Sequence, residues 1–406
     1  MEWKEVRLGD IADVQTGPFG SQLHKSDYIA EGIPCIMPTN IGPHLNFIVD
    51  GIAHVSEVDA NRLSRHLTEI GDIIYARRGD IEKCAYVTTN EEKWLCGTGC
   101  LKIRCNNEVN SRFIAYLLST AECKKWITGN AVGTTMLNLS KGILSNLPLL
   151  VPSHEDQRRI ASILSSLDRK IELNNKINAD LEEMAQAIFK NWFVDFEPFK
   201  DGKFVDSELG KIPEGWKVGR LTDVIKLMPG GTPKTSEPLY WDNGTIPFFS
   251  PKDVNGVYCF ATEKHITETG LNKCSSNLYP KDTIFITCRG TVGKVCLAAC
   301  DMAMNQSNYA IKAIDGYSQY YIFFLVKSVV ERLIKKSNGA VFSAITSKDF
   351  DEEILIPSQK AVEDFTNVID GFFRRIFTIG TENSRLSTLR DTLLPRLMSG
   401  ELEVPE

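Results

Sequence analysis

The fold is decided by residues 147–193, which read LPLLVPSHEDQRRIASILSSLDRKIELNNKINADLEEMAQAIFKNWF. The stretch opens with a short apolar run that ends in Pro-Ser, and serine is a favourable helix N-cap. Beyond Ser153, apolar residues return at alternating steps of four and three, from Ile160 to Ile188. This is the spacing of a coiled-coil seam. The stretch therefore predicts a long helix over residues 153–194, roughly 60 Å in length at ~1.5 Å per residue.

A second stretch of the same design closes the chain and predicts another long helix over residues 358–398. Its seam begins at Val362, after Ser358, and Pro395 should end the helix near its last turn. Each helix could pack on its own domain, but each seam also contains asparagine, which usually sets the register of a coiled coil. We therefore expect antiparallel pairing with Asn174 opposite Asn383 and with Asn178 as a further register residue. A register shifted by one heptad is the alternative.

The rest of the chain contains an internal repeat. WKEVRLGDI at residues 3–11 matches WKVGRLTDV at residues 216–224, and later matches follow in the same order along both halves. Short β-branched and aromatic runs alternate with short helical patterns, which is typical of an α+β domain. The sequence thus predicts similar globular domains over residues 1–152 and 213–357. Residues 195–212 are expected to form a linker and residues 399–406 a C-terminal tail.

Composition excludes several classes of protein. The chain has 406 residues, a formal net charge of −6 and eleven cysteines. No cysteine pair has the C-x-x-C spacing common in zinc sites, so we expect reduced thiols and no metal. No secretory signal and no apolar run of the ~20 residues that span a bilayer is present, which favours a cytoplasmic protein without a membrane. Phosphate-binding, dinucleotide-binding and hydrolase motifs are also missing, and so are NPPY and DPPY, which favours a non-catalytic role.

Taken together, these features resemble one family, the DNA specificity (S) subunit of type I restriction–modification systems. The resemblance is carried by residues 147–193, by SELGKIPEGWKVGRL at residues 207–221 and by LRDTLLPRLMSGEL at residues 389–402. It covers the whole chain, including the order domain, helix, domain, helix. The alternative is an architectural coiled-coil scaffold whose globular domains bind protein and not DNA.

The resemblance implies a function that the residues alone do not. Each globular domain would be a target recognition domain for one half of an asymmetric, bipartite site in double-stranded DNA. The antiparallel coiled coil would set the spacer between the half-sites and dock two methyltransferase (M) subunits, and restriction (R) subunits would join the complex. S-adenosylmethionine, ATP and Mg²⁺ would be bound by the partners, and this chain would hold no cofactor.

Because the globular domains are nearly neutral, DNA phosphates would have to be bound by local clusters of basic residues. Two Gly-rich loops, at residues 16–28 and 229–241, occupy matching places in the two domains, and in both domains Arg follows a β-run just before a Gly. Arginine is the commonest reader of guanine in the major groove, although surface loops and salt bridges are the ordinary alternatives. A third matched pair of loops, containing Thr134, Asn138, Lys141 and Lys348, favours a shared structural role. The predicted DNA contacts are Gln22, His24, Lys25, Arg77, Arg78, Lys234, Thr235, Arg289 and Lys294.

The first long helix has apolar residues beside its seam. Ile163, Ile177 and Met184 share one heptad position, and Phe189 and Trp192 extend the stripe. A two-helix seam does not need this second stripe. It predicts either a docking surface for a partner protein or packing onto the globular domains.

Overall fold

The computed structural model describes residues 2–133, 137–314, 316–336 and 344–404. The chain forms two compact units. Unit 1 consists of Met1–Lys170 with Leu386–Glu406, and unit 2 of Ile171–Arg385. Each unit therefore combines one globular domain with a segment of each long helix, so its core is built from residues far apart in the sequence.

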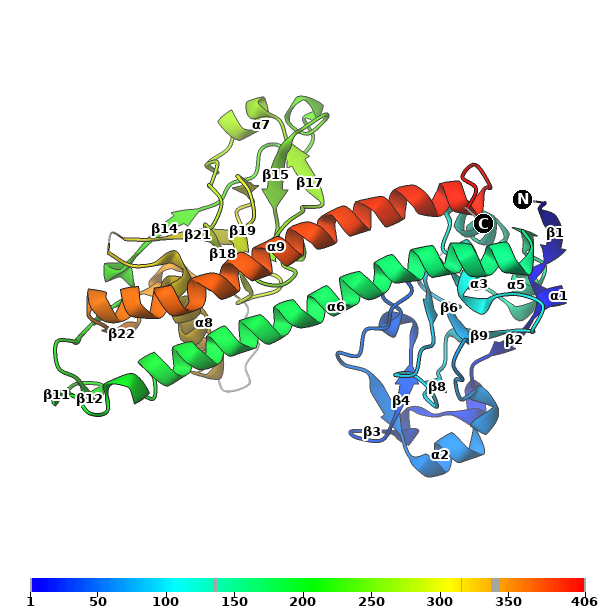
Figure 1. Ribbon diagram of the computed structural model, residues 1–406, viewed down its shortest axis with the longest axis horizontal. Helices are drawn as coiled ribbons and strands as arrows, with labels where there is room; N and C mark the ends of the chain where they lie inside the picture. Colours follow the sequence, from blue (N-terminus) through cyan, green and yellow to red (C-terminus); the bar gives the residue numbers. More distant parts are fainter. Residues whose placement is uncertain (1, 134–136, 315, 337–343, 405–406) are drawn as a thin grey trace. The chain divides into compact units, whose positions relative to one another are not determined.

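Two four-stranded sheets form the globular domain of unit 1 (Figure 1). The main sheet is antiparallel, in the order β2 (Ala12–Thr16), β9 (Cys100–Cys105), β6 (Ile73–Ala76), β7 (Cys84–Tyr86). The minor sheet has the order β3 (Tyr28–Ile29), β5 (Ala53–Val55), β4 (Ile33–Ile36), β8 (Leu95–Cys96), and its β4 and β8 are parallel. Its helices are α1 (Leu8–Ile11), α2 (Glu57–Arg62), α3 (Ser111–Leu118), α4 (Ala121–Asn130) and α5 (Lys141–Ser145).

Unit 2 repeats this plan. Its main sheet has the order β14 (Ile225–Pro229), β21 (Asn308–Ala313), β18 (Ile284–Thr287), β19 (Val295–Ala298), β16 (Tyr258–Cys259). Its minor sheet has the order β17 (Lys264–Ile266), β15 (Ile246–Phe249), β20 (Ala303–Met304), and β15 and β20 are parallel. Its helices are α7 (Glu268–Asn272) and α8 (Gln319–Lys336). The predicted α+β duplication is confirmed.

The matched sequences at the ends of each domain pair with one another. In unit 1, β1 (Lys4–Arg7) is antiparallel to β10 (Pro148–Val151); in unit 2, β13 (Lys217–Arg220) is antiparallel to β22 (Glu353–Ile356). The repeated aspartates cap the turn that follows the first strand. Asp10 accepts a hydrogen bond from the Arg7 amide at 3.1 Å, and Asp223 accepts one from the Arg220 amide at 2.8 Å. The repeat therefore marks where each domain closes on itself.

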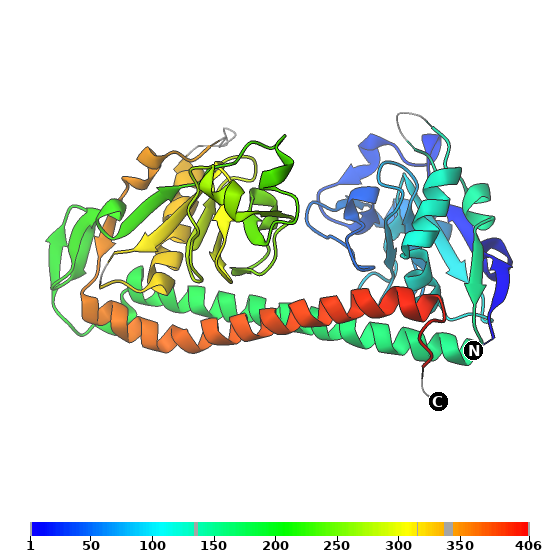
Figure 2. The same cartoon turned by 90° about the horizontal axis from the view of Figure 1, so that it is seen from above.

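The two long helices are α6 (His154–Phe193) and α9 (Gln359–Met398), 40 residues each. Both predicted N-caps are confirmed, because the hydroxyl oxygens of Ser153 and Ser358 accept hydrogen bonds from amides three residues later. Pro395 lies inside the last turn of α9, since the helix continues to Met398. Within each unit the two helix segments lie side by side, as Figures 1 and 2 show.

The helices pair in the predicted antiparallel register. In unit 2, the Asn174 Nδ2 donates to Asn383 Oδ1 at 2.8 Å, and the Asn383 Nδ2 donates to Asn175 Oδ1 at 2.8 Å. In unit 1, the partner of Asp168 is Arg390, so partner numbers rise as positions on α6 fall. Asn178 takes no part in this asparagine pairing, and its buried Oδ1 has no hydrogen-bond partner. The hydrogen bonds between asparagines of the two helices therefore involve Asn174 and not Asn178.

The predicted linker at residues 195–212 contains regular structure. Its strands β11 (Phe204–Ser207) and β12 (Gly210–Pro213) form an antiparallel hairpin. Before the hairpin, the ring of Phe199 packs edge-on against Trp216, with the ring centroids 5.1 Å apart. This aromatic contact ties the connection from α6 to the start of the second domain.

Helices join each main sheet to the long helices through a continuous apolar core. In unit 1, Phe113 on α3 and Ile127 on α4 are fully buried with Ile160 and Leu164 of α6 and Leu397 of α9. The core of unit 2 joins buried residues of α8, α6 and α9 in the same way. Each globular domain is therefore packed against its own segment of the helix pair.

Candidate nucleic-acid interface

Two loops of unit 1 come together at one edge of the main sheet, where β2 and β6 end and β9 begins. They are the first loop (residues 17–27), which follows β2, and the Arg77–Arg78 loop, which follows β6. We call this edge of the sheet the loop edge. Three backbone hydrogen bonds hold it together: the Gly17 amide donates to the Cys100 carbonyl at 3.0 Å, the Arg77 amide to Gly99 at 2.7 Å, and the Leu139 amide to Arg77 at 2.9 Å. The first loop, the Arg77–Arg78 loop and the segment before α5 are thus fixed side by side.

The equivalent edge of unit 2 is held by the equivalent three bonds. The Gly230 amide donates to the Asn308 carbonyl at 3.4 Å, the Cys288 amide to Ser307 at 2.9 Å, and the Ile345 amide to Cys288 at 3.0 Å. This edge is likewise where β14 and β18 end and β21 begins. The same backbone frame therefore presents different side chains in the two domains.

Arginine stands at equivalent positions on both edges. Arg78 is exposed and its backbone bridges to Asn138, and Arg289 is exposed and its backbone bridges to Ala344. These bridges confirm that the third pair of matched loops has a shared structural role. Lys141 forms an ion pair with Asp13 at 3.2 Å, whereas Thr134 lies outside the described residues. An exposed guanidinium on a fixed backbone is suited to contact a phosphate or a base edge.

Arg77 differs from its neighbour because it is half-buried. Its guanidinium carbon lies 5.8 Å from the ring centroid of Phe19, a distance typical of a cation–π contact. Burial lowers the pKa of Arg77, and the adjacent charge of Arg78 adds to the effect. The side chain therefore braces the first loop against the Arg77–Arg78 loop, and Arg78 is left to face solvent.

The other predicted contacts lie beside the minor sheets. His24 and Lys25 are exposed, and Gln22 is half-buried with its carbonyl accepting a hydrogen bond from Arg62 at 2.9 Å. In unit 2, Lys234 and Thr235 are exposed, and the Lys234 carbonyl accepts from the Trp241 indole at 3.1 Å.

Lys294 lies at the loop edge of unit 2, because its amide donates to Thr287 Oγ1 at 3.0 Å and Thr287 ends β18. Lys294 is exposed and lines a groove of about 370 Å³ with Glu182 and Lys327.

Some residues at these surfaces were not predicted from the sequence. Phe19 is an aromatic side chain, 58% exposed, on the first loop of unit 1. In unit 2, Thr232 on the matching loop donates to the side chain of Gln306, and Lys264 lies over the ring of Trp241 at 5.6 Å. Aromatic and cationic side chains that share one loop are a signal that could have pointed to Phe19 and Trp241.

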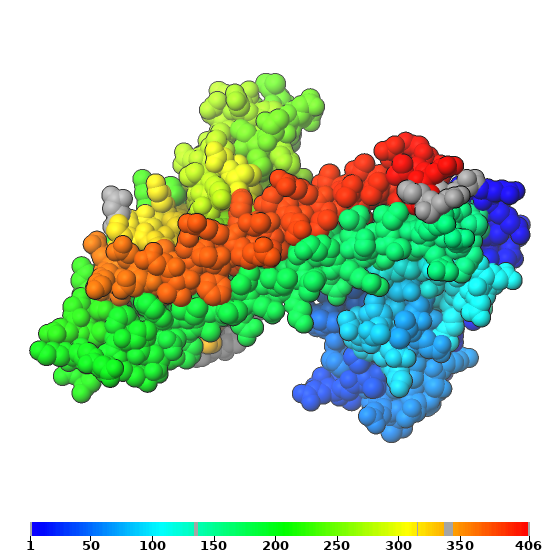
Figure 3. All heavy atoms as spheres, viewed as in Figure 1, coloured from blue at the N-terminus to red at the C-terminus, as the bar shows by residue number. Residues whose placement is uncertain are grey.

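The predicted docking stripe on α6 divides into two parts. Met184 is 52% exposed, and Ile163 and Ile177 are partly exposed. Phe189 is 3% exposed within the core of unit 2, where its ring packs near Phe365. Trp192 also packs near Phe365, so packing onto the globular domain is the better interpretation for these two aromatic residues. The space-filling view shows α6 and α9 uncovered on the face that it presents (Figure 3).

The described residues were compared with what a metal site or a reactive thiol needs. No group of three or more His, Cys, Asp or Glu side chains among them could hold a metal ion. Burial raises the pKa of Cys35, Cys84 and Cys96 to about 12, which keeps these thiols protonated and unreactive. Among the described helices, none is long and apolar enough to cross a membrane.

Two copies of one α+β domain, each with an arginine-bearing loop edge and each joined to a segment of an antiparallel helix pair, define a duplicated recognition protein on a helical scaffold. The family described as the type I restriction modification DNA specificity domain matches residues 1–183 and 213–374. The chain belongs to this family.

Relatives extend the likeness over the full chain. It is 28% identical to the type I restriction enzyme MjaIX specificity subunit of Methanocaldococcus jannaschii, over 100% of this chain and 94% of the relative. It is also 28% identical to the HindI specificity subunit of Haemophilus influenzae, over 99% of this chain and 100% of the relative. The solved structure of the S subunit of the type I restriction–modification system from M. genitalium has a TM-score of 0.59 at 15% identity, covering 98% of this chain and 96% of that one. This last likeness concerns the fold alone.

Proposed function

We propose that this chain is the DNA specificity subunit of a type I restriction–modification complex, and that each loop edge recognises one half of a bipartite target. One observation carries the proposal. The same three backbone hydrogen bonds build the loop edge in both units, yet the side chains on the two frames differ. A duplicated frame with divergent side chains is suited to two different half-sites, and the whole target should therefore be asymmetric.

The proposal assigns the remaining parts of the reaction to partner proteins. Two methyltransferase subunits would dock on the exposed faces of α6 and α9, with Ile163, Ile177 and Met184 as candidate contacts. Restriction subunits would join them in the cytoplasm. S-adenosylmethionine, ATP and Mg²⁺ would be bound by those subunits. We accordingly expect the purified chain with S-adenosylmethionine alone to transfer no methyl group to DNA.

The decisive experiment replaces the two equivalent arginines one at a time. Complexes of the chain with its methyltransferase partner would select from random duplexes, and the enriched sequences would be read for Arg78→Ala and for Arg289→Ala. Each variant should lose or relax selection in one half-site only, by about 1–3 kcal/mol per lost base contact or less for a phosphate contact.

Lys4→Ala and Lys217→Ala are matched controls, because these exposed lysines occupy equivalent positions on the closing strands β1 and β13. They should leave both half-sites unchanged. If the wild-type complex selects no sequence, the scaffold alternative is favoured. If both arginine variants alter the same half-site, the two domains do not recognise DNA independently.

A further inference from the structure

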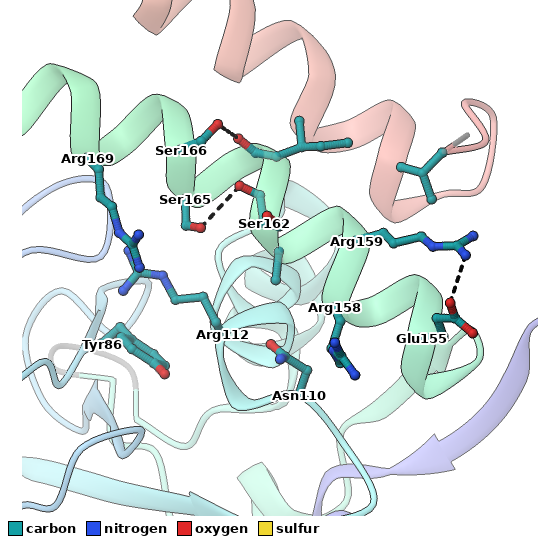
Figure 4. Close-up of a pocket in the computed structure, with 13 residues that line it drawn as sticks. Tyr86, Asn110, Arg112, Glu155, Arg158, Arg159, Ser162, Ser165, Ser166 and Arg169 are labelled. Atoms are coloured by element: carbon teal, nitrogen blue, oxygen red, sulfur yellow. Dashed lines mark hydrogen bonds and ion pairs between the residues drawn. The ribbon is translucent and has the colours of Figure 1, made fainter. Parts of the chain in front are cut away.

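Unit 1 contains a groove of about 870 Å³ between α6 and the start of α3, away from the residues proposed to contact DNA. Its lining includes four arginines, Arg112, Arg158, Arg159 and Arg169, and one acidic residue, Glu155. Arg159 pairs with Glu155 at 2.7 Å, and Figure 4 shows this pair at one end of the groove. The groove therefore carries an excess of positive charge although the whole chain is acidic.

The other three arginines form no ion pair with any residue that the structure describes. The ring of Tyr86 holds Arg112 in place, since the guanidinium carbon lies 4.4 Å from the ring centroid. The buried Nε of Arg112 has no hydrogen-bond partner. In Figure 4, Arg112 and Arg169 extend toward one another in the groove. Like charges held together without counter-charges are unfavourable, and an anionic ligand between them would relieve the repulsion.

The groove and the loop edge lie at opposite ends of the main sheet, so one ligand would not occupy both. Tyr86, on its wall, pairs with Ile73 at the start of β6, whereas the loop edge begins after Ala76 at the end of β6. DNA bound at the loop edge would therefore approach the opposite end of the main sheet. The groove also has an apolar part, formed by Ile163, Ala161 and Val404. A protein segment with both acidic and apolar side chains would contact both parts of this lining, whereas a nucleic-acid backbone offers only phosphates and sugars.

The duplicated helix carries only part of this chemistry. Aligned from their N-caps Ser153 and Ser358, the two long helices place Glu363 and Asp364 where α6 has Arg158 and Arg159. The charge is thus reversed at these two positions of α9, whereas Arg374 stands at the position of Arg169. A ligand that recognises the arginines would bind once per chain, although the fold itself is duplicated.

We propose that this arginine groove docks an acidic segment of a protein partner, with one segment bound per chain. The inference rests on the proposed function only in assuming that the chain works within a multisubunit complex. The segment would place carboxylates on Arg112, Arg158 and Arg169 and an apolar side chain near Ile163. Recognition by charge-assisted hydrogen bonds would weaken as salt screens the exposed part of the groove.

The test uses the full chain and a fluorescent peptide of Asp and Glu with a central Leu, followed by anisotropy. Arg158→Glu with Arg169→Glu should weaken peptide binding by at least about tenfold, and Arg158→Gln with Arg169→Gln by a smaller factor. Arg375→Glu on α9 is the matched control, since Arg375 is exposed and outside the groove, and it should stay within about twofold. A peptide with Asn and Gln for the acids should not bind.

A random DNA duplex is measured beside the peptide. Its affinity for the chain should be unchanged in the Arg158 and Arg169 variants. Three results would overturn the proposal. The wild-type chain could fail to bind the peptide, the charge-reversed variant could bind it unchanged, or DNA affinity could fall as much as peptide affinity. Sequence selection by the wild-type complex is scored separately, so failure of the groove and failure of the proposed function are distinguishable.

Discussion

Breaking the buried ion pair between Arg390 and Asp168 should destabilise unit 1 more than any exposed ion pair on the same helices. The Arg390 side chain is 5% exposed and the Asp168 side chain 11%, and their atoms Nη1 and Oδ1 are 3.1 Å apart. Tyr116 of α3 also donates its hydroxyl to Asp168, and Arg390 reaches His44 at 3.2 Å. The pair thus joins both long helices to the globular domain.

Replacing Arg390 with Met leaves a largely buried carboxylate without its guanidinium, which should cost about 3 kcal/mol. For a unit of this size, that loss corresponds to a fall in Tm of roughly 6–12 °C. The double variant Arg390→Met with Asp168→Leu removes both charges, and it should come within about 1 kcal/mol of the wild type. The coupling between the two positions would then be about 2 kcal/mol or more.

Urea unfolding followed by circular dichroism would measure the cycle, and hydrogen exchange would show whether α3 loses protection. Arg374→Met is the matched control, because Arg374 is 78% exposed in its ion pair with Asp370 and should cost no more than about 0.5 kcal/mol. If the double variant is as unstable as Arg390→Met alone, the cost does not come from an unpaired buried charge and the reasoning is wrong.

Three further predictions concern register, pH and length. Replacing both Asn174 and Asn383 with Leu should raise the free energy of unfolding by about 1 kcal/mol or more but broaden the helix register, which disulfide trapping across the seam would detect. Burial lowers the pKa of His66 to about 4, so the unfolded state binds a proton at a higher pH than the folded state does. The free energy of unfolding should therefore fall as pH drops below 6.5, by about 2 kcal/mol at pH 5. Urea midpoints at pH 7 and pH 5 would measure this, and His66→Gln should lose the dependence. Inserting one heptad near Asn178 and one near Asn383 adds about 10 Å of helix, or about three base pairs at ~3.4 Å each. The gap between the selected half-sites should then lengthen by about one to three base pairs, and binding should weaken. Selection of the original gap with full affinity would contradict the idea that the helices set the spacer.

Local chemistry explains why the long helices were predictable. Each has a serine N-cap followed by a seam of period 3.5, and both signals are short-range properties of the chain. The register was one of several that a heptad repeat allows. It was identified because Asn174 and Asn383 interrupt the apolar seams, and a buried amide is stable only opposite a polar partner.

Tertiary structure decided the features that depend on distant residues meeting. Antiparallel pairing in the main sheet brings Gly17, Arg77 and Leu139 to one loop edge, which no local pattern in these loops indicates. The aromatic end of the docking stripe is buried because Phe189 meets Phe365 across the helix pair.

The arginine groove appears only when α3 packs on α6, since Arg112 and Arg158 are far apart in the sequence. The amino-acid sequence by itself determined the duplication, the two helices and their seam, because period and capping act within a few turns of the chain. The folded chain alone decided which side chains remain exposed for DNA or a partner, because exposure depends on what the rest of the chain covers.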